Sequence, residues 1–297
     1  MTAVKGRKLA DDEVKGVLVD ILDRMDEVLR REKIAYFLYY GTLLGAVRHK
    51  GIIPWDDDVD IVMFRADYDK LARLDWSASG LDFVSHHTRR DYPYLCGKIT
   101  DRRTVLQQGY DHPIDIGLYV DIFPLDEMPS SGVGRWTSER LLDLLKIAQA
   151  IKMIRPRRTR STAKNTVLML GKLILRPVST GTVVRMCHRL ASRPASGSSQ
   201  IASRLGPYGE REIMDRACFS ETEPLDFEGR HFLAPVGWKH ILTSLYRDYM
   251  TPPPPEKRVS THAMEAFLRD PASSGEGRTG SPASAAQGTL DLPPDPT

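Results

Sequence analysis

The sequence predicts an α+β fold in which a β-sheet is flanked by helices, and three observations indicate it. Apolar residues recur at helical spacing over residues 11–33. Short strand-like runs then occur together with helical stretches as far as about residue 126. A basic section at about residues 141–205 adds further apolar helical stretches. We therefore expect helices packed on a sheet around one core.

Length and composition limit the class of protein. With 297 residues and 41% hydrophobic content, the chain can bury a sizeable core and is expected to be soluble and globular. A net charge of +3 is too small to imply a nucleic-acid partner. The three cysteines stand far apart without metal-ligand spacing, so we expect neither a zinc site nor disulfides. No signal peptide and no run of about 18 apolar residues is present, which predicts a cytoplasmic protein.

The first elements are expected to be a helix, a strand and a second helix. Asp11 or Asp12 can cap the first helix, whose apolar positions should cover one face of the sheet. Residues 34–40 form a β-rich aromatic run that ends at Gly41 and Thr42, before apolar positions at helical spacing. A small-residue turn at a helix N-terminus offers backbone N–H groups and the positive dipole end to a phosphate. Gly41 and Thr42 are therefore candidate phosphate-binding residues.

An acidic cluster follows at Asp56, Asp57, Asp58 and Asp60, beside an apolar run at residues 59–64. If this run is a strand, Asp58 and Asp60 project from one face and the apolar side chains from the other. Like charges so close disfavour joint ionisation, whereas a hard divalent cation turns that cost into binding. The cluster predicts a metal site beside a phosphate, as in phosphoryl or nucleotidyl transfer. The alternative is a solvated acidic turn.

Several cations are candidates for binding the phosphates of a leaving nucleotide. Arg48 and Lys50 lie between the turn and the acids, where Arg offers bidentate donors and Lys a point charge. The alternative is an exposed basic loop, and His49 fits either interpretation. Lys98, in a strand predicted over residues 94–100, is a further candidate, although a lone strand lysine is also typical of a solvated edge.

A third carboxylate is expected from a later strand. Residues 115–126 predict a strand that ends at Pro124, with Asp121 among apolar neighbours. A carboxylate in such surroundings is costly without a partner. We predict that Asp121 completes the site of Asp58 and Asp60; the alternative is a capping or turn aspartate.

The remaining elements carry no predicted site. His86 and His87 are expected to be ordinary surface residues. We expect a helix over 67–74, a strand over 81–86, a hairpin strand over 104–107, a hairpin over 225–233 and a helix over 238–250 ended by prolines.

The basic section has its own character, because no acidic residue occurs between Asp143 and Glu210. Helices are predicted over residues 141–154 and 167–178. Basic, partly apolar helices suit an anionic membrane surface or a polyanionic acceptor. The protein is thus expected to contact the inner face of the membrane peripherally; the alternative is a helical cap with a solvated basic face.

Three parts of the chain are expected. The N-terminal helix occupies residues 1–33, and the main domain occupies residues 34–262 with the basic section inside it. Residues 271–297 are rich in Ser, Gly, Ala and Pro and predict a disordered tail.

The sequence resembles the LicD-type transferases, whose relatives include the fukutin-like proteins. The resemblance covers roughly residues 30–262. It rests on YYGTLLGAVRHKGIIPWDDDVDIVM at 39–63, the segment 98–101 with Thr104, YVDIFPLD at 119–126 and LYRDYMTPPPPEKR at 245–258. The family usually has Gly where this chain has Arg247, and a His pair of which only His262 is present.

The resemblance implies a nucleotidyltransferase-like fold with a mixed sheet flanked by helices. It also implies transfer of a phosphoalcohol, such as phosphocholine, from a CDP-linked donor to a hydroxyl of a cell-surface glycan or glycolipid, such as a lipopolysaccharide or teichoic acid precursor. By family match, Gly41 and Thr42 hold the donor phosphate. Asp58, Asp60 and Asp121 are the expected catalytic residues and bind Mg²⁺ or Mn²⁺.

Around that metal, Asp56 and Asp57 would orient the ligands, and one carboxylate would take the proton of the acceptor. Two alternatives stay open from the sequence. One is a nucleotidyltransferase that moves a nucleoside monophosphate from a nucleoside triphosphate to a small hydroxyl compound. The other is a non-catalytic adaptor for a glycan or membrane surface.

Overall fold

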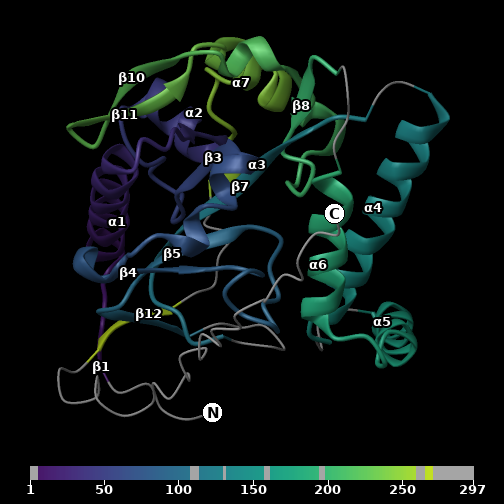
Figure 1. Cartoon of the computed structure of the whole chain (residues 1–297). Helices are drawn as coiled ribbons and strands as arrows, with labels where there is room; N and C mark the ends of the chain where they lie inside the picture. The colour runs from purple at the N-terminus through teal and green to yellow at the C-terminus, as the bar shows by residue number, and fades with distance from the viewer. Residues whose placement is uncertain are drawn as a thin grey trace, which may run out of the picture.

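The computed structural model describes residues 6–107, 114–129, 132–156, 161–193, 198–258 and 265–269. Helices flank mixed sheets in it, which confirms the α+β class (Figure 1). The predicted tail at 271–297 lies outside the described residues. In the described ranges, no helix is long and apolar enough to cross a membrane.

The central sheet has the strand order β2-β3-β7-β5-β4. β3 and β7 run parallel and the other neighbours in that order run antiparallel. β8 extends the sheet from the end of β7, and β9 pairs with β8. The strands are β2 Phe37–Leu38, β3 Asp60–Phe64, β4 Leu81–Val84, β5 Gly97–Asp101, β7 Tyr119–Glu127, β8 Gln200–Ala202 and β9 Met214–Asp215.

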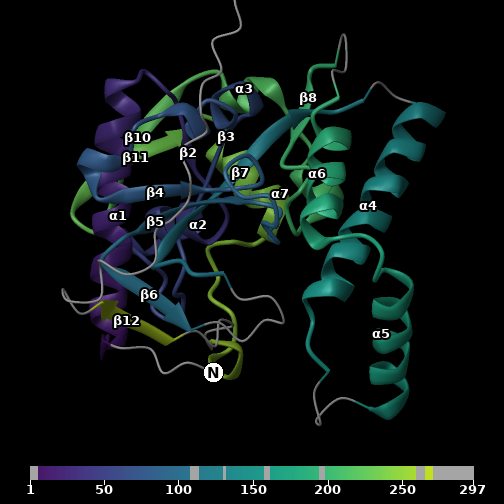
Figure 2. The ribbon, with the colours of Figure 1, turned by 60° about the horizontal axis from the view of Figure 1, so that its bottom comes forward.

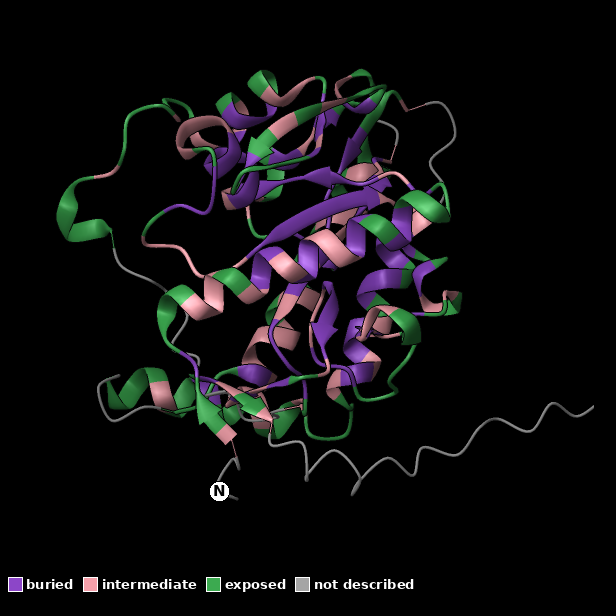
Figure 3. Ribbon diagram, turned by 90° about the vertical axis from the view of Figure 1, so that its left-hand side faces the viewer, coloured by how far each residue is buried: buried purple, intermediate pink, exposed green. Residues whose placement is uncertain are grey.

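Helix α1 (Asp11–Arg31) covers part of this sheet and contacts β5 and β7. Its inward positions, among them Leu18, Ile21 and Leu22, are buried in the main core (Figure 3). Its N-cap is Ala10, so the predicted cap by Asp11 or Asp12 is wrong. Glu13 instead accepts a hydrogen bond from the Ala10 N–H at 2.9 Å, and the acids of the first turn face the positive dipole end.

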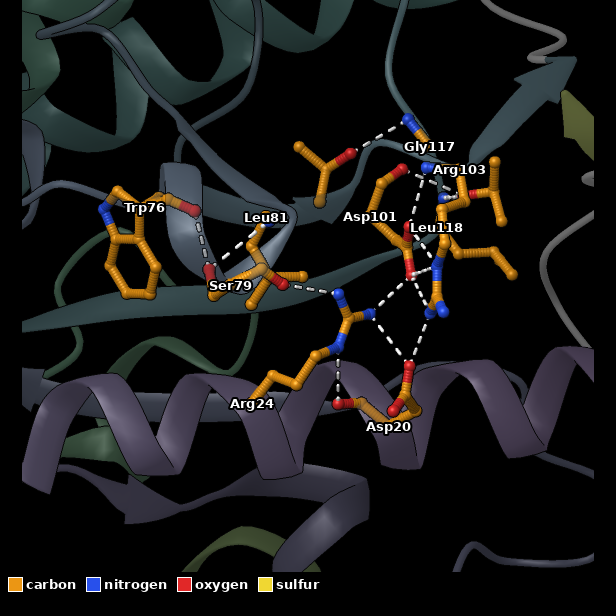
Figure 4. A network of polar contacts seen from close by, with 11 residues as sticks. Asp20, Arg24, Trp76, Ser79, Leu81, Asp101, Arg103, Gly117 and Leu118 are labelled. Atoms are coloured by element: carbon orange, nitrogen blue, oxygen red, sulfur yellow. Dashed lines mark hydrogen bonds and ion pairs between the residues drawn. The ribbon is translucent and has the colours of Figure 1, made fainter. Parts of the chain in front are cut away.

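A polar network fastens α1 to the sheet (Figure 4). The Arg24 guanidinium donates to the fully buried Asp101 carboxylate on β5 at 2.5 Å and to the Ser79 carbonyl at 2.7 Å. Arg103 binds the same carboxylate at 2.6 Å and also binds Asp20 at 2.5 Å. Burial disfavours the charged Asp101, but the hydrogen bonds from Arg103 and Arg24 outweigh it and lower its pKa.

The first predicted strand is shorter than expected. β2 ends at Leu38, the Tyr39 N–H still bonds the Asp60 carbonyl, and Tyr40 already opens helix α2 (Tyr40–His49). Tyr40 makes this change of direction with φ 43°. The strand-to-helix turn therefore lies at Tyr39 and Tyr40, and Gly41 and Thr42 belong to the first helical turn.

The expected hairpin strand over 104–107 is wrong in its pairing. β6 (Thr104–Gln107) pairs with β12 (Glu265–Arg269), which also pairs with β1 (Gly6–Lys8). These three strands form a separate small sheet. Its middle strand comes from the far end of the chain, which local sequence patterns cannot reveal.

Two strand and helix ends also differ from expectation. β7 continues through Pro124. Its pairing with β5 ends at Ile122, so no hydrogen bond to β5 is lost when Pro124 lacks an N–H. Helix α7 (Trp238–Tyr246) ends well before residue 250. Arg247 there adopts φ 61° and ψ −106°, a conformation that favours Gly.

The other predicted elements are short or hold as expected. The predicted helix over 67–74 is α3 (Arg65–Tyr68) followed by a 3₁₀ turn, Leu71–Arg73. The hairpin is confirmed as β10 (Thr222–Phe227) and β11 (Arg230–Pro235). Further 3₁₀ turns are Ser77–Ser79, Gly209–Glu212, Arg216–Phe219 and Pro255–Lys257.

The basic section forms three helices, of which the sequence predicted two. They are α4 (Val133–Met153), α5 (Thr162–Ile174) and α6 (Thr180–Ala191). α6 packs against α4, and α5 packs against α4. In two views α4 and α5 stand at one side of the molecule, with α6 between α4 and the sheet (Figures 1 and 2).

Candidate active site

An acidic cavity of about 490 Å³ lies where β3 and β7 begin and α2 starts. It brings together four of the predicted acids, Asp56, Asp58, Asp60 and Asp121, with Gly41. Asp60 and Asp121 are neighbours in the parallel register of β3 and β7. The rest of the lining is Tyr40, Leu44, Ile53, Phe123, Pro207, Tyr208 and Tyr246.

Asp60 is the most buried acid of the cavity, at 8% exposure. Its backbone N–H donates to the Thr42 hydroxyl at 2.7 Å. Burial raises the pKa of Asp60 well above its usual range, and the charges of Asp58, Asp121 and Asp56 raise it further. A cation beside Asp60 would relieve both effects.

Asp121 is balanced by Lys98. The Lys98 ammonium lies 2.5 Å from the Asp121 carboxylate and 3.4 Å from the centre of the Tyr119 ring. Lys98 is 3% exposed, and although burial disfavours its charge, Asp121 and Tyr119 raise its pKa well above the usual value. Lys98 is therefore a buried counter-charge rather than a solvated edge residue.

Gly41 and Thr42 occupy different positions relative to the cavity. Gly41 lines it, and a Cβ at this position would come within 2.7 Å of the Asp56 carboxylate. Thr42 is buried at 3% exposure, and its hydroxyl accepts from Asp60 instead of pointing to a ligand. Thr42 thus fixes the backbone of Asp60.

The predicted cations of the basic loop lie elsewhere. Arg48 and Lys50 are at the far end of α2 from Gly41 and do not line the cavity. Arg48 donates to His49 and to the Tyr249 carbonyl, both at 2.9 Å, and lies 5.9 Å from the Trp55 ring. Asp57 is half-buried and donates its N–H to the Asp56 carboxylate at 3.2 Å.

The side chains of the cavity include oxygen donors of the kind that a divalent metal binds. Across the described ranges, no three His, Cys, Asp or Glu side chains are grouped closely enough to hold an ion. Asp121 already binds Lys98, which removes it from such a group. Mg²⁺ needs only one or two protein carboxylates when substrate phosphates supply other oxygens. Asp58 and Asp60 are two such carboxylates, and both line the cavity.

Sequence reasoning missed the aromatic wall and one buried acid. Tyr40, Tyr208 and Tyr246 line the cavity, with successive ring centroids 5.5 and 5.6 Å apart. Buried Glu212 accepts from the Tyr40 hydroxyl and, at 2.7 Å, from the Tyr208 N–H. Burial raises the pKa of Glu212 to about 7. Tyr40 and Tyr246 lie within stretches that carry the resemblance, whereas Tyr208 and Glu212 come from a chain segment without a local signal.

The expectation that His86 is an ordinary surface residue is wrong. Its ring stacks on His188 at 3.6 Å and on Tyr68 at 6.2 Å. Burial, with the charges of His87 and Arg65, lowers the pKa of His86 to about 3. His188 comes from α6, which the sequence did not predict.

Comparison with known proteins agrees with the resemblance. Residues 33–163 match the family described as LicD/FKTN/FKRP, nucleotidyltransferase domain. The lipopolysaccharide cholinephosphotransferase LicD of Haemophilus influenzae is 31% identical over 277 residues, covering 88% of this chain and 99% of that protein.

More distant relatives match shorter stretches. The ribitol 5-phosphate transferase FKRP of Homo sapiens is 42% identical over 53 residues, or 18% of this chain and 11% of that protein. The uncharacterized protein RP689 of Rickettsia prowazekii is 41% identical over 75 residues, 22% of this chain and 28% of that protein. With a relative at 31% identity along nearly its whole length, the chain belongs to the LicD family and is a transferase.

Proposed function

We propose that this protein transfers a phosphocholine-like group from a CDP-linked alcohol to a hydroxyl of a cell-surface glycan or lipopolysaccharide, releasing CMP. The observation that carries the proposal is one cavity that combines four carboxylates with a wall of aromatic rings. The similarity to a lipopolysaccharide cholinephosphotransferase supports the kind of group and the kind of acceptor.

The aromatic wall suits the choline end of such a donor. Quaternary ammonium groups bind over the faces of Tyr, Trp and Phe, where the ring quadrupole attracts a cation. Tyr40, Tyr208, Tyr246 and Phe123 offer such rings beside the acids. The carboxylates add negative charge on the same side, so a positively charged alcohol is favoured over a neutral one.

The acids suit a metal-assisted transfer. Asp58 and Asp60, with Asp121 beside them, would hold Mg²⁺ or Mn²⁺, which would neutralise charge on the oxygens of the transferred phosphoryl group. Thr42 holds the Asp60 backbone in place, and Asp56 lies beside Gly41 at the start of α2. One cavity carboxylate accepts the proton of the acceptor hydroxyl.

Lys98 has a distinct part in this proposal. Its ammonium compensates Asp121, so the cavity keeps fewer unbalanced negative charges next to incoming phosphates. Arg48 and Lys50 do not line the cavity, so their contact with phosphate stays a prediction from the sequence.

The test is release of CMP from a panel of CDP-alcohols by the purified protein, with lipopolysaccharide as acceptor, with and without Mn²⁺. We expect metal-dependent release that Asp58→Asn lowers more than about a hundredfold. Asp11→Asn, an exposed acid on α1, is the matched control and should keep full activity.

Two results would decide against the proposal. Pyrophosphate released from a nucleoside triphosphate, without CMP release from any CDP-alcohol, would assign the cavity to nucleotidyl transfer. A protein that binds glycan or vesicles equally well with and without Asp58→Asn, and turns over neither donor, would be a non-catalytic adaptor.

A further inference from the structure

Most of the exposed large apolar side chains gather on two helices. Sixteen such side chains are exposed in the described part of the chain, and the 12 between Val133 and Val178 lie on α4, on α5 or next to them. Helices of a soluble protein normally turn their apolar stripe to the core, so an outward stripe of this extent marks a contact surface.

Helix α5 shows this reversal most clearly. Leu168 is its buried side chain, and a Cβ on Gly171 would lie 3.1 Å from Ile151 of α4, which marks the packed side. The other side exposes Val167, Met169, Leu170, Leu173 and Ile174, each between 54% and 76%. The helix thus presents its wider apolar face to the surroundings.

Helix α4 continues the surface. Val133, Trp136, Leu144 and Ile147 follow helical spacing and are exposed by 55% or more. Ile151, on the same stripe, meets Gly171 of α5. Trp136, Leu144 and Ile147 also line an open, mainly apolar groove of about 950 Å³. That groove shares Phe123 and Pro207 with the acidic cavity.

The charge around this surface is mainly positive, because the two acids of α4 are paired: Glu139 lies 2.6 Å from Arg204 and Asp143 lies 3.7 Å from Arg140. The sequence carries no acid between Asp143 and Glu210. Arg155, Lys164, Arg176 and Arg189 are exposed on or next to the three helices. Exposed apolar side chains flanked by cations match the interface of an anionic bilayer, where the apolar groups enter the acyl region and the cations meet lipid phosphates.

We propose that the exposed face of α4 and α5 is a docking surface for an anionic lipid bilayer. A second copy of the chain fits less well, because a two-fold interface uses the same patch of both copies and would place one positively charged face against another. Docking in this way would hold the groove, and through it the acidic cavity, next to the membrane. The inference goes beyond the proposed reaction and does not depend on it, since it concerns binding without donor or acceptor.

The experiment is co-sedimentation of the full chain with phosphatidylcholine vesicles, with and without phosphatidylglycerol. We expect binding to the anionic vesicles that weakens with salt. Leu170→Glu/Ile174→Glu should lower it tenfold or more, and Lys164→Gln/Arg176→Gln should also weaken it. Val236→Glu/Met250→Glu and Arg73→Gln, on other exposed surfaces, are the matched controls and should bind as the wild type does.

Circular dichroism of each variant would establish that it is folded. Equal binding to neutral and anionic vesicles, or full binding by Leu170→Glu/Ile174→Glu, would overturn the proposal. So would a dimer in light scattering that this pair of substitutions dissociates, without vesicle binding by the wild type.

Discussion

Two neighbouring acids of the cavity are treated in opposite ways by their surroundings. Asp121 has the ammonium of Lys98 at 2.5 Å. Asp60, one strand away in register, has three carboxylates around it and a pKa well above its usual range, first through burial. Of these two carboxylates, Asp121 is in contact with a cation, and in the proposed reaction Asp60 is the one beside which a cation of the substrate or a metal ion would bind.

Glu212 gives a prediction about pH at the residue scale. Its pKa of about 7 in the folded protein lies above the ordinary value of 4.5, because burial favours the neutral form. Because the carboxyl pKa is higher in the folded protein than in the unfolded chain, Glu212 contributes stability that is fully present at a pH below the unfolded pKa. That stability is lost as the pH rises through the folded pKa of about 7. Between pH 5 and 8, Glu212→Gln should therefore lose less stability than the wild type, by about 2–3 kcal/mol.

Urea unfolding at a series of pH values measures this difference. Glu210→Gln, an exposed neighbour, is the control and should follow the wild-type slope. Parallel curves for the wild type and Glu212→Gln would show that Glu212 does not titrate in this range.

At the scale of elements, α1 and β5 are joined through buried charge rather than by apolar contact alone. Asp101 is fully buried, and both Arg24 and Arg103 reach it. Such a carboxylate stays charged only while its donors remain, because an unpaired buried charge is costly.

Arg24→Met should consequently lower the free energy of unfolding by about 2–3 kcal/mol, since it leaves Asp101 with Arg103 alone and removes the bond to the Ser79 carbonyl. Arg31→Met on the same helix is the matched control. Arg31 pairs with Glu32 at the surface, so its loss should cost less than about 0.5 kcal/mol. Equal destabilisation of the two variants in urea unfolding would contradict the argument.

Elements with a local cause were predictable from the sequence. Helix α1 and the hairpin β10–β11 follow from spacing and turn residues. The cost of an unpartnered carboxylate among apolar neighbours predicted that Asp121 joins Asp60, and the two are neighbours in register. Elements set by distant partners were not. β6 pairs with β12 rather than in a hairpin, and Tyr208, which lines the cavity, and Glu212, which binds Tyr40, come from a late chain segment. Tertiary packing decides such contacts, and no short pattern encodes them.

On the scale of the whole molecule, the last described strand belongs to the folded body. β12 pairs on one side with β1 and on the other with β6, and its Ala266 is 4% exposed. The chain therefore closes its small sheet with residues beyond 262, where the predicted domain ended.

Two truncations test this closure by thermal unfolding. Removal of residues 271–297, the predicted disordered tail, should leave the Tm unchanged. Removal of residues 265–297 also takes β12 away and should lower the Tm by several degrees, because two strands lose their hydrogen-bonded partner. Identical Tm values for both truncations would show that β12 contributes nothing to stability.

The parallel pairing of β3 and β7 has a consequence for how the chain folds. Asp60 and Asp121 meet across this pair although about 60 residues separate them, so the chain must close a long loop before the centre of the sheet exists. Closing it also forces two aspartates together, which opposes the step electrostatically. Pairing across such a separation slows folding. We therefore expect the acidic cavity to form late in folding, and Asp60→Asn should refold faster than the wild type when stopped-flow fluorescence follows dilution from urea.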